Sequence, residues 1–345
     1  MAAKFSAISK STEIYFRFVN EQGGVHGRSI KYHYADDGFQ AIRTQEVIRE
    51  LVLRKPVFLI LNGLGTATHA SVSAWLQSLK VPDFFVGSSD PQWTEPVKET
   101  VFGFQPTPRV EGRALAKYLL QSHPGEQVVV WHRDDPQMKE ASEHLSTLLT
   151  ANHTPTHTMT HPMLPFDLDA HLDQIRQLNP KAIVLFTSSL PAIQFLESVQ
   201  KHGPQSNIYL GHDLADSRLL EWVGVEAMEG VSVLSSFPLA SQADHPGIQF
   251  HRSLLREYDP ELTINRWTIY GQAVAELMVE ILYRSGRNLT RQSVIGTAED
   301  LDQWNGVLSP PITLSAQNHQ AITKLRITRV QSGKFETISD WIDSK

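Results

Sequence analysis

The chain has 345 residues and a mass of 38.8 kDa, enough for two domains that each have a core of their own. Its formal charge of -6 and pI near 6.2 come with no basic stripe, so we expect no nucleic-acid partner. Cysteine is absent, which excludes disulfides, thiolate nucleophiles and cysteine-bound metals. No apolar run approaches the roughly 20 residues of a membrane-spanning helix.

Helix and strand patterns alternate from the start of the chain. An apolar stripe over residues 15–19 predicts a helix that ends at Gly23 and Gly24. The strand-like run SIKYHYADDG follows at residues 29–38, and VFLILNG at residues 57–63 predicts a buried strand. The next predicted elements are a helix over 66–80 and a strand over 81–88.

The same alternation continues to about residue 237. The predicted elements there are a helix after Pro108, a strand over 128–132, a helix over 137–150, an extended Thr/His-rich segment, a helix over 168–178, a strand over 182–187, a helix over 191–202, and strands over 207–211 and 230–237. Residues 245–305 are mainly helical in pattern, and the last residues alternate with period two around Gly333, which predicts an antiparallel hairpin. This order predicts an α/β fold with parallel sheets covered by helices.

Proline-containing joints predict where the chain passes between domains. They lie at residues 105–108, 237–238 and 309–311. Three crossings predict two lobes built from discontinuous segments. Lobe 1 is expected to hold residues 1–106 and 239–309, and lobe 2 residues 107–238 and 310–345.

Several stretches, in order, resemble the type I periplasmic solute-binding proteins of the branched-chain amino acid (Leu/Ile/Val-binding) ABC transporter family. They are YFRFVNEQGGVHGRSIKYHYADDG, LNGLGTATHASV, VFGFQPTPRVEGRALAKYLL, WHRDD and ITKLRITRVQSGKFETISDWI. The resemblance implies two doubly wound parallel-sheet lobes joined by three hinge crossings, which capture an amino acid or related small carboxylate between them by hinge closure. It also implies a permease partner, a periplasmic or extracellular location, no cofactor and no enzymatic activity.

The resemblance also predicts that the first strand of lobe 1 is missing. Family members place a strand ahead of the helix that here contains residues 15–19, and only residues 1–8 precede it. Its absence is expected to unpair KYHYAD and FLILNG, at about 1–3 kcal/mol for each buried backbone group. We therefore expect either further sequence upstream or another segment or chain in that slot. No secretory signal is visible after Met1, so a cytoplasmic location is expected if residue 1 is the true start.

Two loops of lobe 1 are candidate ligand sites, because ligands of open parallel sheets bind beyond the carboxyl ends of strands. By resemblance, Leu64, Gly65 and Thr66 grip a ligand carboxylate, and the Thr66 hydroxyl and the N–H groups that follow suit that role. The plainer alternative is that Thr66 caps a helix. The second loop offers Ser88, Ser89 and Asp90, and the alternative there is an ordinary turn.

Lobe 2 contributes a third set of candidates. Amino-acid-binding relatives carry an acidic residue at the position of Asp213, which can pair with a ligand ammonium. The alternative is an N-cap for a helix over 217–222, for which Asp216 competes. Trp131 and Ser188 are candidates to line the ligand from this lobe.

Two histidine-containing segments and the scaffold itself suggest other functions. His153, His157 and His161 have helical metal-ligand spacing, but the surrounding prolines and threonines favour an extended segment. His132 could act as a general base with Asp134 and Asp135 as orienting carboxylates, yet no hydrolase, Walker or zinc-protease motif accompanies them. A ligand sensor on the same scaffold, without a transport partner, remains the main alternative to a transport protein.

Overall fold

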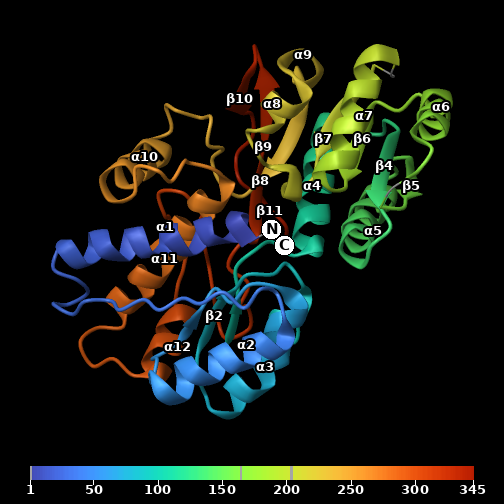
Figure 1. Ribbon diagram of the computed structural model, residues 1–345. Coiled ribbons are helices and arrows are strands. Elements are labelled where there is room, and N and C mark those ends of the chain that lie inside the picture. Colours follow the sequence, from blue (N-terminus) through green and yellow to red (C-terminus); the bar gives the residue numbers. More distant parts are fainter. Residues whose placement is uncertain (1, 164, 203–204) are drawn as a thin grey trace. The chain divides into compact units, whose positions relative to one another are not determined.

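The computed structural model describes residues 2–163, 165–202 and 205–345. The chain forms two compact units, each assembled from two segments (Figure 1). Unit 1 comprises Met1–Pro106 and Pro246–Ile322, and unit 2 comprises Thr107–His245 and Thr323–Lys345. The α/β fold with parallel sheets is the one expected from the alternating pattern.

The second and third crossings lie further along the chain than the prolines predicted. Leu239 packs in the core of unit 2, so the segment after residue 238 stays with that unit. Residues 310–322 stay with unit 1, because Ala321 N–H donates to Gly103 O at 3.0 Å and the His319 ring stacks on Phe102. The boundaries at 238/239 and 309/310 are therefore corrected to 245/246 and 322/323.

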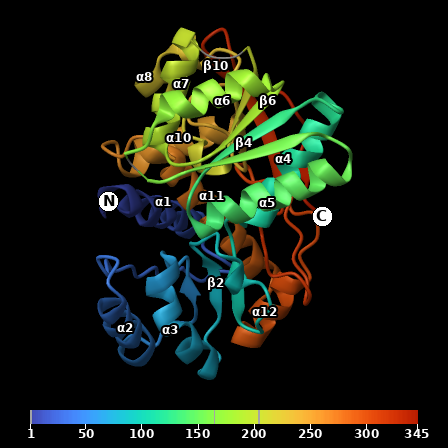
Figure 2. The same ribbon diagram turned by 90° about the vertical axis from the view of Figure 1, so that its right-hand side faces the viewer.

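Unit 1 contains a parallel three-stranded sheet in the order β1-β2-β3. Its elements are α1 (Ala2–Glu21), α2 (Ala41–Arg49), a π-helical extension η1 (Glu50–Arg54), β1 (Ile60–Leu61), α3 (Thr66–Ser78), β2 (Asp83–Val86), the 3-10 turn η2 (Pro91–Trp93), β3 (Val101–Gly103), α10 (Pro246–Tyr258), α11 (Arg266–Arg284) and α12 (Arg291–Glu299). Figure 2 shows α2 and α3 on one side of β2 and α12 on the other. A small apolar core joins Ile48 of α2, Ile60 of β1 and Leu76 of α3.

The start of unit 1 differs from the sequence prediction. Helix α1 begins at Ala2, so residues 2–8 belong to the same helix as residues 15–19 and do not precede it, and α1 ends before Gly23, whose φ is 99°. The expected strand at residues 29–38 is irregular, and only Ile60 and Leu61 of the expected strand at 57–63 pair in the sheet. No strand precedes α1 in the part of the chain that the structure describes.

Unit 2 contains a larger mixed sheet in the order β10-β9-β8-β7-β6-β4-β5, with β11 paired to β9. Its elements are α4 (Pro108–Ser122), β4 (Val128–Arg133), α5 (Pro136–Ala151), β5 (Thr156–His161), α6 (Leu168–Leu178), β6 (Ala182–Phe186), α7 (Ser189–His202), β7 (Asn207–Leu210), the 3-10 turn η3 (His212–Leu214), α8 (Leu219–Val223), α9 (Val225–Met228), β8 (Ser232–Ser235), β9 (Lys324–Gln331), β10 (Lys334–Thr337) and β11 (Ile342–Asp343). Strands β4 to β8 pair in parallel, whereas β9 is antiparallel to β8 and β10.

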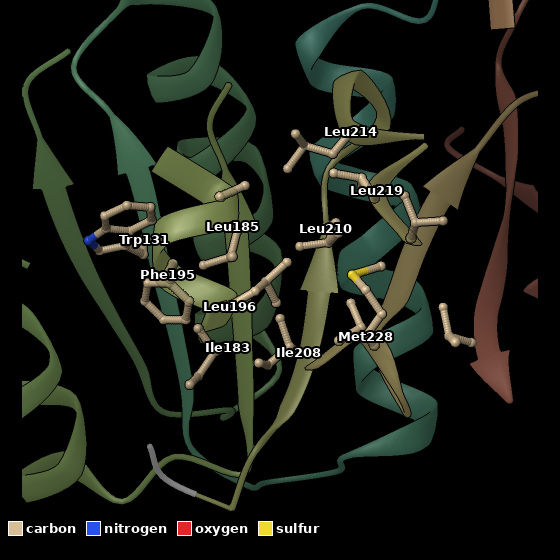
Figure 3. Packing of buried hydrophobic residues seen from close by; sticks show 14 of the residues in the cluster. Trp131, Ile183, Leu185, Phe195, Leu196, Ile208, Leu210, Leu214, Leu219 and Met228 are labelled. Carbon is tan, nitrogen blue, oxygen red and sulfur yellow. The ribbon is translucent and has the colours of Figure 1, made fainter. Parts of the chain in front are cut away.

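Local sequence signals explain where several elements of unit 2 begin and end. Thr107 and Asp135 cap α4 and α5, each followed by a proline in the first helical turn. The hairpin between β9 and β10 turns at Ser332 and Gly333, which both have positive φ, as a two-residue turn between twisted strands requires. The hairpin prediction is confirmed. The core below the sheet is continuous, with Leu185 and Leu210 on adjacent strands packed against helix residues (Figure 3).

Candidate functional site

In unit 1 the loops that follow β1 and β2 lie side by side at the carboxyl ends of the strands. Leu64 forms a parallel bridge with Gly87, and Gly87 N–H donates to Gly63 O at 2.9 Å. A side chain at position 87 would meet Leu64, since a Cβ there would lie 2.4 Å from Leu64 Cδ2. The two predicted site loops of lobe 1 are thus brought together.

A hydroxyl pair joins these loops. Thr66 Oγ1 lies 2.7 Å from Ser88 Oγ, and Ser88 Oγ also accepts the Asp90 N–H at 3.2 Å. Thr66 opens α3 but does not cap it: the N-cap residue is Gly65, with a φ of 90° and no side-chain bond to the helix. The prediction that Thr66 caps the helix is therefore wrong, because the turn at Gly65 directs its hydroxyl to Ser88 instead.

The first turn of α3 adds backbone donors to the hydroxyl pair. Thr66 and Ala67 begin this helix, and the first N–H groups of a helix have no acceptor within it. The macrodipole adds positive potential at the same end. Thr66 is half-buried, and no acidic residue lies in the first turn. Hydroxyls and N–H groups without a competing carboxylate suit a small anion.

The remaining predicted residues of this edge have different surroundings. The Asp90 carboxylate accepts the Gln92 N–H at 3.0 Å and caps η2, so it stabilises a turn locally. Ser89 is half-buried beside it. The turn alternative therefore describes Asp90, and of this loop Ser88 is the residue tied to Thr66.

Buried polar contacts hold the two loops from behind. His69 Nε2 lies 2.7 Å from Asp83 Oδ2, and both side chains are buried. Burial lowers the pKa of His69, but the adjacent Asp83 carboxylate outweighs it and the pKa is raised. Gly63 is required here, because a Cβ would lie 2.3 Å from the His69 ring. Tyr270 donates to Asn62 Oδ1 at 2.8 Å from α11. Neither the His69–Asp83 contact nor the Tyr270–Asn62 contact was predicted from the sequence, since the partners are distant in the chain or lie on different elements.

In unit 2 two predicted residues follow adjacent parallel strands. Ser188 comes after β6 and is half-buried, and its carbonyl accepts the Ala192 N–H at 3.2 Å at the start of α7. Asp213 comes after β7, in η3, and its side chain is exposed. Because β6 and β7 are neighbours in the sheet, both residues lie at one edge of it.

Glu111 positions the Asp213 turn and was not predicted from the sequence. Glu111 Oε1 accepts the backbone N–H of His212 at 2.5 Å, and the His212 ring lies 2.7 Å from Ser236 Oγ. Gly211 passes close to Glu111, where a Cβ would lie 2.6 Å from Oε1. No sequence signal marks this role, because an acidic residue in the first turn of α4 is already favoured by the helix dipole.

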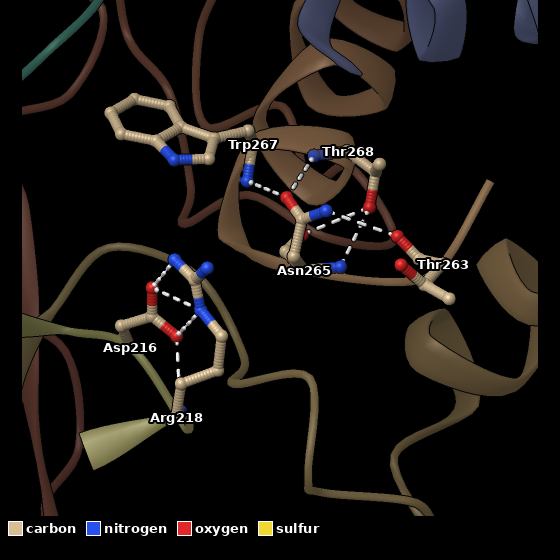
Figure 4. A network of polar contacts seen from close by, with 6 residues as sticks. All are labelled: Asp216, Arg218, Thr263, Asn265, Trp267 and Thr268. Atoms are coloured by element: carbon tan, nitrogen blue, oxygen red, sulfur yellow. Dashed lines mark hydrogen bonds and ion pairs between the residues drawn. The ribbon is translucent and has the colours of Figure 1, made fainter. Parts of the chain in front are cut away.

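Neither aspartate of this region caps α8. The N-cap of α8 is Arg218, without a side-chain cap bond. Asp216 instead accepts from the Arg218 backbone and guanidinium (Figure 4). The guanidinium also lies over the Trp222 ring, 4.9 Å from its centroid. The predicted cap role is therefore wrong for both residues.

Trp131 is a core residue rather than a ligand wall. Its side chain has no exposed surface and packs with Phe195 (Figure 3). Its ring stacks on His161, with 3.8 Å between the ring centroids. Its indole N–H donates to His171 Nδ1 at 3.0 Å. The prediction for Trp131 is corrected, because β4 is covered on both faces and the aromatic fills the core.

The histidines considered for other chemistry have structural partners. The segment 156–161 is a strand, β5, as its composition predicted. His161 lies 3.0 Å from Thr187 Oγ1, and burial lowers its pKa to about 4. His132 contacts Thr160 Oγ1 at 3.1 Å, and Asp135 caps α5 and pairs with Arg133. Among the described residues, no group of three acidic, histidine or cysteine side chains is arranged to hold a metal ion.

Comparison with known proteins decides the family. The sequence profile of periplasmic binding proteins matches residues 1–334. The chain belongs to the periplasmic binding protein family. No curated protein matches its sequence closely enough to count as a relative.

Solved structures share this family fold at low sequence identity. A branched-chain amino acid ABC transporter protein from Thermus thermophilus, with bound valine, has a TM-score of 0.80 at 18% identity, covering 99% of this chain and 93% of that one. A leucine-binding protein from Thermotoga maritima has a TM-score of 0.73 at 19% identity, with 98% and 95% covered. A fatty acid ABC transporter substrate-binding protein from Thermomonospora curvata has a TM-score of 0.76 at 17% identity, with 99% and 88% covered. In the described residues, no helix has the length and apolar character needed to cross a bilayer.

Proposed function

We propose that this chain is the solute-binding component of an ABC transporter and captures an amino acid or related small carboxylate by hinge closure of its two units. The observation that carries the proposal is the Thr66–Ser88 hydroxyl pair, 2.7 Å apart, beside the amino end of α3. A carboxylate placed there would accept hydrogen bonds from these hydroxyls and from backbone N–H groups, and no acidic residue lies in the first turn of α3. Leu64 and Gly65 shape the loop that carries them.

In this proposal unit 2 binds the positively charged end of the ligand. Asp213 would pair with an ammonium group, and Glu111 holds the turn that presents it through the His212 N–H. Ser188, at the end of the neighbouring strand, is the second candidate contact. Ser89 and Asp90 belong to the same proposed site, although the Asp90 carboxylate already caps η2.

The names of the solved relatives support a carboxylate without fixing its type. Valine, leucine and fatty acids share a carboxylate and an apolar remainder. Only the amino acids carry an ammonium group, so the role of Asp213 distinguishes the two classes. A transporter permease as partner and a periplasmic or extracellular location complete the proposal, which assigns no catalytic residue and no cofactor.

A thermal-unfolding screen of single solutes tests this function. The solutes are the amino acids, their analogues without the amino group, and fatty acids of increasing length. A bound solute stabilises the folded chain by about 2.7 kcal/mol when its concentration is 100 times the dissociation constant. We expect a saturable rise in melting temperature with at least one carboxylate and none with the matching amide. Equal responses to acid and amide, or no response to any carboxylate at millimolar concentration, would contradict the proposal.

A further inference from the structure

Arg326 of β9 carries a guanidinium group that no other described residue neutralises. Its Nε and Nη2 atoms are buried and have no hydrogen-bond partner. Among the described residues the side chain also makes no ion pair. Its contact is with Trp341, since the guanidinium carbon lies 4.6 Å from the centroid of that ring. Buried charged donors are normally paired, so an acceptor is expected for this arginine.

The immediate neighbours of Arg326 do not supply that acceptor. Ser235 of β8 lies directly opposite it across the antiparallel pair. The Ser235 hydroxyl lies 3.3 Å from Thr328 Oγ1, so these two hydroxyls bond to each other. Burial lowers the pKa of Arg326 to about 10, and no carboxylate of the described ranges opposes that effect. The group therefore keeps its positive charge at neutral pH without a counter-charge from the described chain.

The guanidinium remains accessible on one side. Arg326 is half-buried, and its third nitrogen, Nη1, is not one of the enclosed atoms. A carboxylate that approaches Nη1 also lies next to Nη2, because both nitrogens are bonded to the same carbon. The planar group thus presents two N–H donors side by side to a ligand, while Trp341 covers one of its faces.

The charge at this position suits a monovalent anion. His245 is close enough to Arg326 for the two to interact electrostatically, and burial together with Arg326 lowers the pKa of His245. Its ring is therefore uncharged at neutral pH and adds no second positive charge. One planar cation balances one planar carboxylate, whereas a phosphate or sulfate dianion would keep an uncompensated charge in a partly buried place.

Arg326 lies at the sheet edge that also carries Asp213. Strand β8 ends at Ser235, opposite Arg326, and the hydroxyl of the next residue, Ser236, lies 2.7 Å from the His212 ring. His212 and Asp213 follow β7, the neighbour of β8 in the sheet. Two strand spacings, about 10 Å, separate the backbones of β7 and β9. One edge of unit 2 therefore carries both a cation and a carboxylate.

We propose that Arg326, stacked on Trp341, binds a carboxylate at this edge of unit 2. The contacts that define the site all come from unit 2. The carboxylate is either a free ion or a second acid group on the solute of the proposed function. The second source rests on that function and narrows the solute to an amino acid with two carboxylates, whose ammonium group pairs with Asp213.

The test follows the indole N–H resonance of Trp341, assigned with Trp341→Phe, while the full chain is titrated with sodium acetate at constant ionic strength. A carboxylate bound to Arg326 changes the surroundings of this ring, because the guanidinium lies over it. We expect a saturable shift with acetate and none with acetamide, the uncharged molecule of similar shape. The absence of a saturable shift, or an equal shift with acetamide or sodium chloride, would overturn the proposal.

Two substitutions on β9 form a matched pair. Arg326→Lys keeps the charge but not the planar pair of donors, so it should weaken acetate binding at least tenfold. Arg329 is also half-buried, but its Nε already donates to Ser232 Oγ at 2.9 Å, so Arg329→Lys should bind acetate as the wild type does. Equal binding by both variants would contradict the assignment. Acetate should also raise the melting temperature of the wild type but not that of Arg326→Met, which removes the unpaired charge.

Glutamate and glutamine identify the source of the carboxylate. If the solute supplies it, the wild type binds glutamate at least tenfold more tightly than glutamine, and Arg326→Lys loses this preference. Equal affinities for the two amino acids, with acetate binding intact, assign the site to free carboxylate ions. Acetate binding at Arg326 without binding of any amino acid would reject the proposed amino acid solute and leave this site standing.

Discussion

The hydroxyl of Thr66 illustrates how much one residue contributes to the proposed site. It contacts Ser88 across 22 residues of sequence rather than capping its own helix. In the proposed site this hydroxyl donates to the ligand carboxylate, and a hydrogen bond to a charged group is worth about 1.5–3 kcal/mol. Thr66→Ala should therefore weaken carboxylate binding about ten- to a hundredfold, measured by titration calorimetry. Ser78→Ala, at the exposed far end of α3, is the control and should bind as the wild type does. Similar losses in both variants would remove Thr66 from the site.

A buried carboxyl group makes the stability of unit 1 depend on pH. Glu276 Oε1 accepts from Gln272 at 2.6 Å, and its other oxygen accepts the Val307 N–H at 3.2 Å. Burial raises the pKa of Glu276 from 4.5 to about 7. The folded chain then holds this proton to higher pH than the unfolded chain. The stability that protonated Glu276 contributes is fully present below about pH 4.5 and is lost as the pH rises through 7.

Glu276→Gln separates this effect from other titrations. Once Glu276 is ionised in both the folded and the unfolded chain, a pKa difference of this size lowers the free energy of unfolding by about 3 kcal/mol. The free energy of unfolding of the variant, relative to the wild type, should increase by about 2–3 kcal/mol between pH 5 and pH 8. Urea denaturation at several pH values measures it. Parallel pH profiles for the two proteins would show that Glu276 does not titrate in this range.

His251 is joined to the same network and titrates in the opposite sense. Its Nδ1 lies 2.6 Å from Gln272 Oε1 and its Nε2 lies 2.9 Å from Thr268 Oγ1, which belongs to the capping box at Asn265 (Figure 4). Burial lowers the pKa of His251 to about 4. Stability contributed by neutral His251 is present above about pH 6.5 and is lost as the pH falls through 4. In the wild type, the free energy of unfolding therefore falls with rising pH because of Glu276 and rises with pH because of His251. The His251 contribution is common to both proteins, so the difference in free energy of unfolding between Glu276→Gln and the wild type reports Glu276.

At the scale of elements, the packing of α1 on α11 depends on a glycine. A Cβ at Gly271 would lie 2.4 Å from the backbone oxygen of Ile8. Ser11 and Thr12 reinforce this approach by donating to Thr268 O at 2.7 Å and Gly271 O at 3.0 Å. Gly271→Ala forces the helices apart and should destabilise the chain by about 1–3 kcal/mol in urea denaturation.

Gly296 of α12 provides a matched control for this prediction. It also lies within a helix, but a Cβ there meets nothing within 4 Å. Gly296→Ala should therefore stabilise the chain by up to about 1 kcal/mol through helix propensity. A loss of stability at position 296 equal to that at position 271 would indicate that the α1–α11 contact is not the cause.

Elements whose partners are close in sequence were predicted well, and those that depend on distant partners were not. The β9–β10 hairpin and the helices after Thr107 and Asp135 carry their own turn and cap signals. Residues 29–38 have strand composition but lack a paired neighbour, so composition alone could not produce a strand. Trp131 lies on a strand covered on both faces, and sequence alone could not separate a core aromatic from one that faces a ligand. The Thr66–Ser88 contact depends on the positive φ of Gly65, which no local pattern reveals.

At the scale of the whole molecule, the proposal divides one solute between two units. Unit 1 offers hydroxyl and N–H donors at the amino end of α3, and unit 2 offers the exposed carboxylate of Asp213 on a turn held by Glu111. Complementary groups of this kind would hold a zwitterion by its two charges and leave the apolar part to set specificity. Because the proposal assigns the donor groups to unit 1 and the carboxylate to unit 2, each can be changed by a substitution in its own unit.

The most direct measurement is titration calorimetry of the wild type and Asp213→Asn with two ligands. The first is the amino acid that most stabilises the wild type, and the second is the same molecule without its amino group. We predict that Asp213→Asn weakens binding of the amino acid at least tenfold while binding of the analogue changes by less than about twofold, since only the amino acid carries the charge that Asp213 would pair with. Equal losses for both ligands, or unchanged binding of the amino acid, would contradict the assignment of Asp213 as the ammonium partner.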